Sequence, residues 1–334
     1  MTASSALLVI ALLIPGGSGA VRVAATAREN SPGPTDDLAR LAALEAYIDQ
    51  GNFQEVASGL TDYLKNYPES WRAHYDLGYV QFRTHLIGAS IKELSRSLQL
   101  NLSNAEAHKI LALDCNIVGR YDLAETELEE AKRLKPGSAE IHYLLGRLYY
   151  TKGVYPLART EFESAVHLDP SYMKAYNNLG LTMEILGDSQ AALENYSTAA
   201  QLDEKQKLNS QWPYVYLSAY FNRQEKPEQA LSYARRALDI DSRSDLAYFQ
   251  MAKAYRFQDQ WQQAAAAAEM AIRINPNTPD FCYVLSLALR KLGKAPDRQR
   301  AMDTFQKLQR QASRSTQRAS GRLAQDPAMA GHDD

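Results

Sequence analysis

The segment from residue 139 to residue 170 reads AEIHYLLGRLYYTKGVYPLARTEFESAVHLDP and places small and apolar residues at helical spacing, with no reactive group among them. Segments with the same spacing begin thirty-four residues earlier and thirty-four residues later. A fixed period of this length is the sequence signature of a repeat architecture, in which each unit packs against its neighbours. The segment therefore predicts that the chain is an array of repeated units.

The periodic region begins at residue 37 and contains eight units. A fixed period of thirty-four residues gives seven of the eight starts, and one start requires a four-residue insertion at residues 207–210. The units begin at Asp37, Trp71, Ala105, Ala139, Met173, Gln211, Asp245 and Pro279. We predict two subarrays, units 1–5 over residues 37–206 and units 6–8 with a capping helix over residues 211–312, with a local change of direction at the insertion.

Each unit repeats the same small and apolar positions. Apolar residues at positions 4, 7, 8 and 11 fall on one face of a first helix, and those at positions 20, 24, 27 and 28 fall on one face of a second. Small residues at positions 8 and 20 allow the two helix axes to approach closely. Glycine at position 15 suits a left-handed helix end, and proline at position 32 ends the second helix. Each unit is therefore predicted to be an antiparallel helix pair.

The Leu-Gly, alanine and proline positions closely resemble the tetratricopeptide repeat over about 270 residues. This resemblance implies an all-α protein, a right-handed superhelical solenoid of about eight helix-turn-helix units with a C-terminal capping helix. The first unit and residues 294–312 depart from the pattern, as the caps of an array must. Residues 313–334 are predicted to be a disordered tail.

The N-terminus differs from the repeats. Residues 6–14 read ALLVIALLI, and Ser18 and Ala20 follow at the spacing of a signal-peptide cleavage site. This run is much shorter than the roughly 20 residues that span a membrane. We predict a signal peptide at residues 1–20, a flexible linker at 21–36, and a periplasmic or secreted mature chain without a stable membrane span. No Lys or Arg precedes the run, which leaves open a cytoplasmic protein with an apolar N-terminus.

Composition and motifs exclude several function classes. The chain has 37 Lys and Arg against 39 Asp and Glu, whereas a domain that holds a phosphate backbone normally carries a basic excess, so nucleic acid is not a predicted partner. The sequence contains no HExxH, GxGxxG, Walker or GxSxG motif, and too few residues lie outside the repeats for a catalytic domain. We therefore predict no enzyme activity, no catalytic residue and no cofactor.

Three histidines recur at position 4 of consecutive units, namely His74, His108 and His142. Equivalent helices in a stack lie at least about 8 to 10 Å apart, so three such imidazoles cannot converge on one ion. We predict that these histidines pack the repeats together and that they form no metal site.

In the tetratricopeptide repeat family, the first helices line a concave groove, chiefly with positions 2, 5, 9 and 12. The resemblance therefore implies a groove here in which aromatic rings alternate with basic residues, as partner surfaces often do. The predicted groove residues are Arg72, Tyr75, Tyr79, Lys109, Tyr143, Arg147, Tyr150, Lys174, Asn177, Trp212, Phe249 and Lys253. A second interpretation stays open for each ring, which is packing against a neighbouring repeat.

These observations predict an exported scaffold that binds a protein or peptide segment in its groove. The basic residues favour a partner with acidic side chains beside aromatic or aliphatic anchors. An alternative keeps the fold and makes the chain a non-catalytic regulatory or targeting subunit of an extracytoplasmic enzyme complex, in envelope or secretion assembly. A third interpretation, a glycan-handling or transferase protein, requires a catalytic domain that the sequence does not show.

Overall fold

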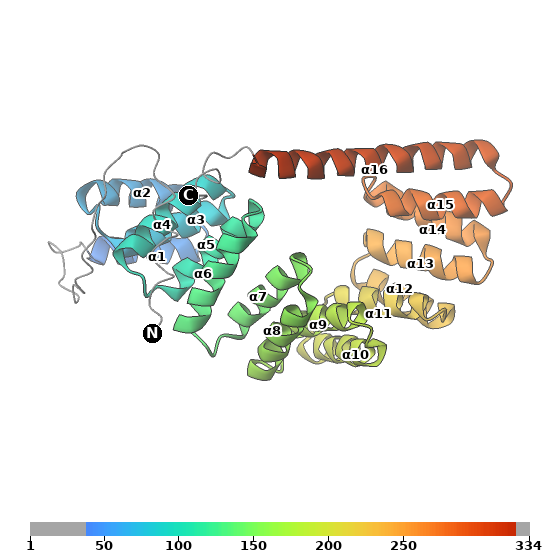
Figure 1. Cartoon of the computed structure of the whole chain (residues 1–334), viewed down its shortest axis with the longest axis horizontal. Helices are drawn as coiled ribbons and strands as arrows, with labels where there is room; N and C mark the ends of the chain where they lie inside the picture. Colours follow the sequence, from blue (N-terminus) through green and yellow to red (C-terminus); the bar gives the residue numbers. More distant parts are fainter. Residues whose placement is uncertain (1–37, 325–334) are drawn as a thin grey trace, which may run out of the picture. The chain divides into compact units, whose positions relative to one another are not determined.

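The computed structural model describes the backbone of residues 38–324 and the side chains of residues 38–313. The predicted signal peptide at 1–20 and linker at 21–36 lie outside these residues, and so does the end of the predicted tail at 325–334. Every element in the described part is an α-helix, which confirms the predicted all-α class (Figure 1). Among the residues described, no helix is both long enough and apolar enough to cross a membrane.

The chain divides into two compact units, one ending at Pro170 and the other beginning at Ser171. The first contains α1 (Leu38–Asp49), α2 (Phe53–Asn66), α3 (Trp71–Arg83), α4 (Ile87–Leu100), α5 (Ala105–Ile117), α6 (Tyr121–Leu134), α7 (Ala139–Thr151) and α8 (Tyr155–Leu168). The second contains α9 (Met173–Ile185), α10 (Ser189–Gln206), α11 (Trp212–Arg223), α12 (Pro227–Ile240), α13 (Asp245–Phe257), α14 (Trp261–Ile274), α15 (Pro279–Lys291) and α16 (Ala295–Ala324). Each odd-numbered helix packs against the helix that follows it, as the repeat pattern predicts.

Glycine at position 8 allows the paired helices to approach closely. A Cβ atom added to Gly146 of α7 would lie 2.6 Å from the ring of Phe162 in α8, and one added to Gly180 of α9 would lie 2.6 Å from the ring of Tyr196 in α10. Both rings are fully buried. In both repeats, a large side chain at position 24 therefore packs directly on the backbone of the facing helix. This confirms that the small residue at position 8 allows the two helices to approach closely.

The inserted residues 207–210 fall inside the second unit, between α10 and α11. Helix α10 has 18 residues and ends at Gln206, and its C-cap residue Lys207 has a left-handed φ of 54°. Asp203 of α10 is buried, and its carboxylate accepts hydrogen bonds from the Ser210 amide at 2.8 Å and from the Tyr214 hydroxyl at 3.2 Å. These bonds connect α10 to the insertion and to α11. The predicted change of direction at this point stays a prediction.

The last helix extends beyond the predicted cap. Helix α16 continues to Ala324, so the structure differs from the predicted tail over residues 313–324. No proline occurs between Pro296 and Pro327, and the segment is rich in Gln, Arg and Ala, which favour helix. The ring of Phe305 in α16 lies against Tyr283 of α15, with ring centroids 5.5 Å apart.

Candidate partner-binding face

Helix α3 carries an ordered pair of aromatic rings from the predicted groove. Tyr75 and Tyr79 stack with their ring centroids 6.5 Å apart. The Arg83 guanidinium donates a hydrogen bond to the Tyr79 hydroxyl at 2.7 Å and lies 4.9 Å from the centre of the Phe53 ring. Burial raises the pKa of Tyr75, with a further contribution from Glu106. Both tyrosines remain partly exposed, so their rings are accessible to a partner.

Two predicted groove cations of the first unit already have counterions. Arg72 forms an ion pair with Glu45 of α1 at 2.7 Å, and Lys109 forms ion pairs with Glu106 and Glu140, each at 2.7 Å. Burial alone would lower the pKa of Lys109, but hydrogen bonds from its ammonium to the two carboxylates raise it. These two side chains therefore present little uncompensated positive charge to a ligand.

Of the three predicted groove residues on α7, one is buried and two reach the surface. Tyr143 is only 9% exposed, and its ring packs against Phe162 with centroids 6.0 Å apart. Arg147 is exposed, and its guanidinium lies 5.8 Å from the centre of the Tyr143 ring. Tyr150 is partly exposed and meets Tyr155 edge to face at 5.5 Å. Tyr143 thus occupies the core in the structure, whereas Arg147 and Tyr150 reach the surface.

In the second unit, Trp212 is the most accessible predicted ring. It is 45% exposed and stacks on Tyr216 at 6.1 Å, and Tyr216 in turn stacks on the buried Tyr196 at 5.7 Å. Lys174 is exposed, whereas Asn177 is 3% exposed and belongs to the interior. The Trp212 ring is therefore held in place from behind while one part of it faces solvent.

Lys253 and Phe249 lie together on α13. The Lys253 ammonium lies 5.5 Å from the centre of the Phe249 ring, which packs against Phe281 at 4.9 Å. Burial lowers the pKa of Lys253, and the positive charges of Arg223 and Arg256 lower it further. No carboxylate of the described side chains lies within 4 Å of this ammonium. Lys253 therefore differs from Lys109, which has two counterions.

Several of the helix pairs match models of known protein families. Models described as tetratricopeptide repeat match residues 41–101, 174–206 and 246–278, and one described as TPR repeat matches residues 146–187. The chain contains tetratricopeptide repeats. No curated protein matches it significantly.

Solved structures share the tetratricopeptide repeat fold of this chain. In the crystal structure of the APC/C hetero-tetramer Cut9-Hcn1, a chain with 19% identity covers 74% of this chain and matches over 48% of its own length, with a TM-score of 0.62. A tetratricopeptide repeat protein from Parabacteroides merdae covers 75% of this chain and 98% of itself, at 14% identity and a TM-score of 0.60. PilW, a type IV pilus biogenesis factor, covers 60% of this chain and 92% of itself, at 16% identity and a TM-score of 0.55. These similarities show the fold alone.

The position 4 histidines of three consecutive tetratricopeptide repeats make the same contacts. The Nδ1 atoms of His74, His108 and His142 lie 2.6 or 2.7 Å from a glutamate carboxylate on the second helix of the same repeat. Their Nε2 atoms lie 3.1 or 3.2 Å from a backbone carbonyl oxygen of the preceding loop. Each imidazole ring thus connects its own first helix to the second helix of the repeat and to the preceding loop. This is the packing role that the sequence predicts. Within residues 38–313, no three His, Cys, Asp or Glu side chains are placed to share a metal ion.

The first tetratricopeptide repeats also bury two aspartates. Asp114 of α5 is fully buried, and burial raises its pKa to about 6 despite an opposing contribution from the Ser90 hydroxyl. Asp76 of α3 is 7% exposed, and burial raises its pKa to about 7, with Glu45 raising it further and Arg72 lowering it. In an unfolded chain an aspartate has a pKa of about 3.9. The folded protein therefore retains protons on these groups that the unfolded chain loses.

Because the pKa values of these two aspartates are higher in the folded protein than in the unfolded chain, the free energy of unfolding should fall as pH rises. The contribution of both groups is fully present below about pH 4 and is lost as pH rises through about 6 to 7. We expect a lower melting temperature at pH 8 than at pH 5, and we expect Asp114→Asn to stabilise the protein at pH 8 by about 2 kcal/mol. Thermal unfolding followed by circular dichroism at both pH values measures this. The exposed Asp49→Asn is the control, and equal effects of the two variants would contradict the account.

Proposed function

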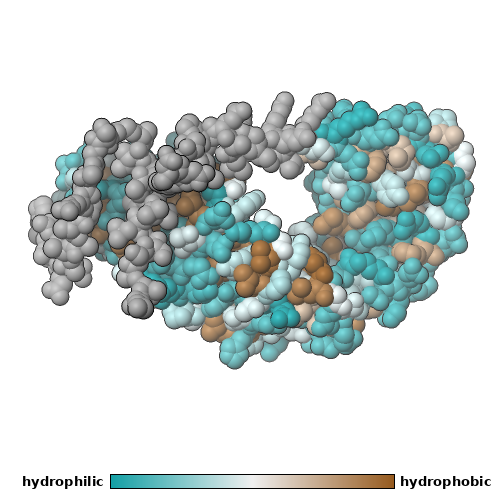
Figure 2. All heavy atoms as spheres, viewed as in Figure 1, coloured by the Kyte–Doolittle hydropathy of each residue, from teal (hydrophilic) through white to brown (hydrophobic). Residues whose placement is uncertain are grey.

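We propose that the chain is a non-catalytic scaffold that binds a partner protein through exposed residues of the first helix of each pair, the odd-numbered helices. The exposed and supported ring of Trp212 carries this proposal, because a rigid aromatic side chain buries a large area at little entropic cost. Tyr79 and Tyr150 add partly exposed rings on two other first helices. Figure 2 shows brown apolar patches within a mostly hydrophilic visible surface.

Capture of partners from a lysate of the source cells tests the proposal. If Trp212 is an anchor, Trp212→Ala should weaken binding of the captured protein by about 2 kcal/mol, or roughly thirtyfold. Tyr121→Ala is the matched control, because Tyr121 is a 38% exposed ring that also begins a helix, but a second helix. Equal binding by wild type and Trp212→Ala, or equal losses in the two variants, would count against a first-helix binding face.

We also propose that the chain is exported and functions outside the cytoplasm. The support is the apolar run at residues 6–14 and the small residues that follow it. N-terminal sequencing of the native protein should find a mature chain that begins near Val21. An intact N-terminus in a cytosolic fraction would refute export without affecting the binding proposal.

A further inference from the structure

The second unit has a shallow cavity of about 400 Å³ at the ends of α13 and α15 and the start of α14. None of its lining residues is among the twelve predicted groove residues. Four of them nevertheless lie at positions 5, 9 and 12, which are groove columns, and the other three lie at positions 13 and 17 of their repeats. The lining combines cations with aromatic rings. The cations and rings are Arg256, Phe257, Trp261, Tyr283, Arg290 and Lys291, and Leu287 completes the lining.

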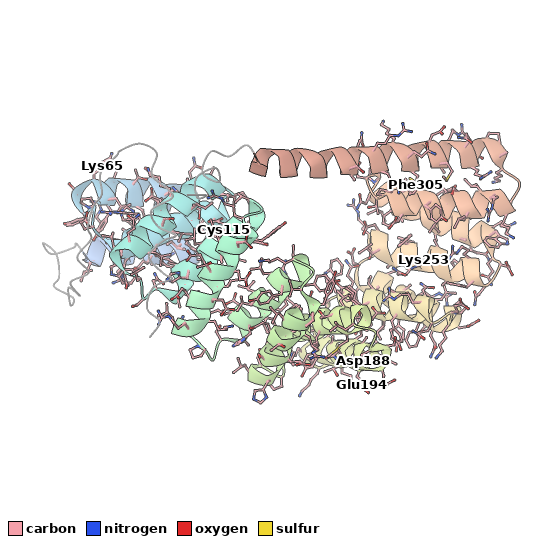
Figure 3. All side chains as sticks on the ribbon, viewed as in Figure 1. Lys65, Cys115, Asp188, Glu194, Lys253 and Phe305 are labelled. Carbon is pink, nitrogen blue, oxygen red and sulfur yellow. The ribbon has the colours of Figure 1, made fainter. Side chains whose placement is uncertain are left out.

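The cations of this cavity form no ion pair with any side chain in residues 38–313. Among the described side chains, no carboxylate lies within 4 Å of Arg256, Arg290 or Lys291, whereas Arg72 and Lys109 in the first unit are paired. No Asp or Glu lines the cavity. Lys253, labelled in Figure 3, lies one turn before Arg256 on α13 and adds a fourth positive charge nearby. The region therefore has a net positive potential, which the nearby Asp280 carboxylate reduces only in part.

The rings of the cavity are held in place and remain accessible. Phe257 is 38% exposed and Tyr283 is 44% exposed. The Lys291 ammonium lies 5.4 Å from the centre of the Trp261 ring, and the Arg256 guanidinium lies 5.3 Å from that of Phe257. Phe305 of α16, also labelled in Figure 3, supports Tyr283 at 5.5 Å. The cavity thus offers apolar area directly beside cations.

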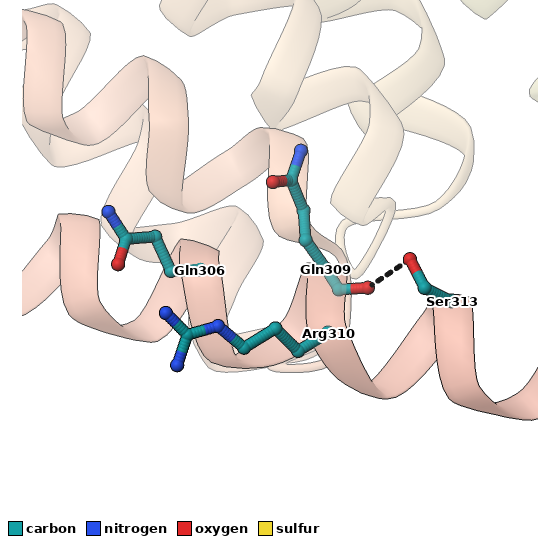
Figure 4. A pocket seen from close by; sticks show the side chains of 4 residues that line it. All are labelled: Gln306, Gln309, Arg310 and Ser313. Carbon is teal, nitrogen blue, oxygen red and sulfur yellow. Dashed lines mark hydrogen bonds between the residues drawn. The ribbon is translucent and has the colours of Figure 1, made fainter.

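Helix electrostatics explain only part of this arrangement. Arg256, Arg290 and Lys291 lie in the last turns of α13 and α15, where a cation interacts favourably with the helix dipole by about 0.3 to 1 kcal/mol. The dipole does not account for exposed rings in the same place. A second hollow, on α16, provides a contrast, because polar side chains of one helix line it, namely Gln306, Gln309, Arg310 and Ser313 (Figure 4).

We propose that the α13–α15 cavity binds an acidic segment of the partner protein, with carboxylates on the arginines and an aromatic side chain against Phe257 and Tyr283. Arginine binds carboxylates through two parallel hydrogen bonds, and the apolar wall needs an apolar group to cover it. A protein fits better than nucleic acid, because the chain has a net charge of −2 and the cations are local. This inference rests on the proposed scaffold function and specifies its ligand.

A short labelled peptide tests the cavity directly on the full chain. The probe is fluorescein-Gly-Asp-Glu-Phe-Glu-Asp-Gly, and the comparison peptide has alanine in place of phenylalanine. Fluorescence anisotropy should show saturable binding of the probe and at least about fivefold weaker binding of the alanine peptide. Absence of saturable binding, or displacement of the probe by inorganic phosphate at the concentration of the peptide itself, would overturn the proposal.

Substitutions of residues that line the cavity test whether the peptide probe binds there. We expect Arg290→Glu to weaken binding of the probe at least tenfold, and the control Arg273→Glu, an exposed arginine on α14 with the same charge change, to bind within twofold of wild type. Tyr283→Ala should weaken the phenylalanine peptide and leave the alanine peptide unchanged. Circular dichroism must show wild-type helix content in each variant. Equal losses in Arg290→Glu and Arg273→Glu would refute the site, whereas the Trp212 experiment tests the scaffold function independently.

Discussion

Replacing Gly146 with leucine should destabilise the first unit by about 3 kcal/mol. A single Cβ atom at this position would already lie 2.6 Å from two atoms of the Phe162 ring, and that ring is fully buried. The remaining leucine carbons require α7 and α8 to separate, which opens the core of that repeat. The urea midpoint of unfolding, followed by far-ultraviolet circular dichroism, measures the loss.

A second helical glycine provides the control for this prediction. Gly88 of α4 has no atom within 4 Å of an added Cβ. Alanine is the better helix former by roughly 0.5 to 1 kcal/mol, so Gly88→Ala should raise the midpoint. Gly146→Ala should lower it despite the same gain in helix propensity. If both alanine variants shift the midpoint in the same direction, close packing at position 8 does not hold the repeat together.

His108→Ala should cost about 3 kcal/mol of stability. His108 and Glu127 are the most buried of the three histidine–glutamate pairs, with side chains 7% and 10% exposed and 2.6 Å between their bonded atoms. Removing the imidazole leaves the Glu127 carboxylate buried without its hydrogen-bond donor, and it also removes the contact with the Leu102 carbonyl oxygen. Thermal and urea unfolding of the full chain measure the effect.

Variants of two other histidines test whether the loss of stability comes from breaking the His108–Glu127 pair or from removing any histidine. His167→Ala removes an exposed histidine of α8 and should change stability by less than about 0.5 kcal/mol. His74→Ala should cost less than His108→Ala, because the His74 and Glu93 side chains are 12% and 16% exposed. A His108→Ala protein as stable as the His167→Ala protein would show that the pairs do not stabilise the repeats.

The sequence predicted the helix pairs because packing between adjacent helices is periodic. A small residue at position 8 and an apolar residue at position 24 recur in seven of the eight units, as Gly146 and Phe162 do. The same periodicity assigned Tyr143 to the predicted groove at position 5. The position within a repeat does not determine how far a side chain is buried. In the structure the Tyr143 ring turns onto Phe162 and is largely removed from the surface.

Charge pairing was less predictable, because its partners lie in different repeats. Glu45 lies 27 residues before Arg72, and Glu140 lies 31 residues after Lys109, so neither pair is visible within one unit. The α13–α15 cavity lies only partly on the groove columns, which hold Arg256 and Tyr283 at positions 12 and 5. Phe257 and Trp261 lie at the turn between two helices rather than on the four columns that the family resemblance selects.

Site-specific photo-crosslinking in the source cells tests the proposed binding face most directly. Benzoylphenylalanine would replace Tyr79, Trp212 or Tyr283 on first helices, and Tyr121 or Leu157 on second helices, all of which are at least partly exposed. The account predicts that the first-helix positions crosslink to one common partner protein and that the second-helix positions do not. Crosslinks to that partner from Tyr121 and Leu157 alone, with none from Tyr79, Trp212 or Tyr283, would contradict it.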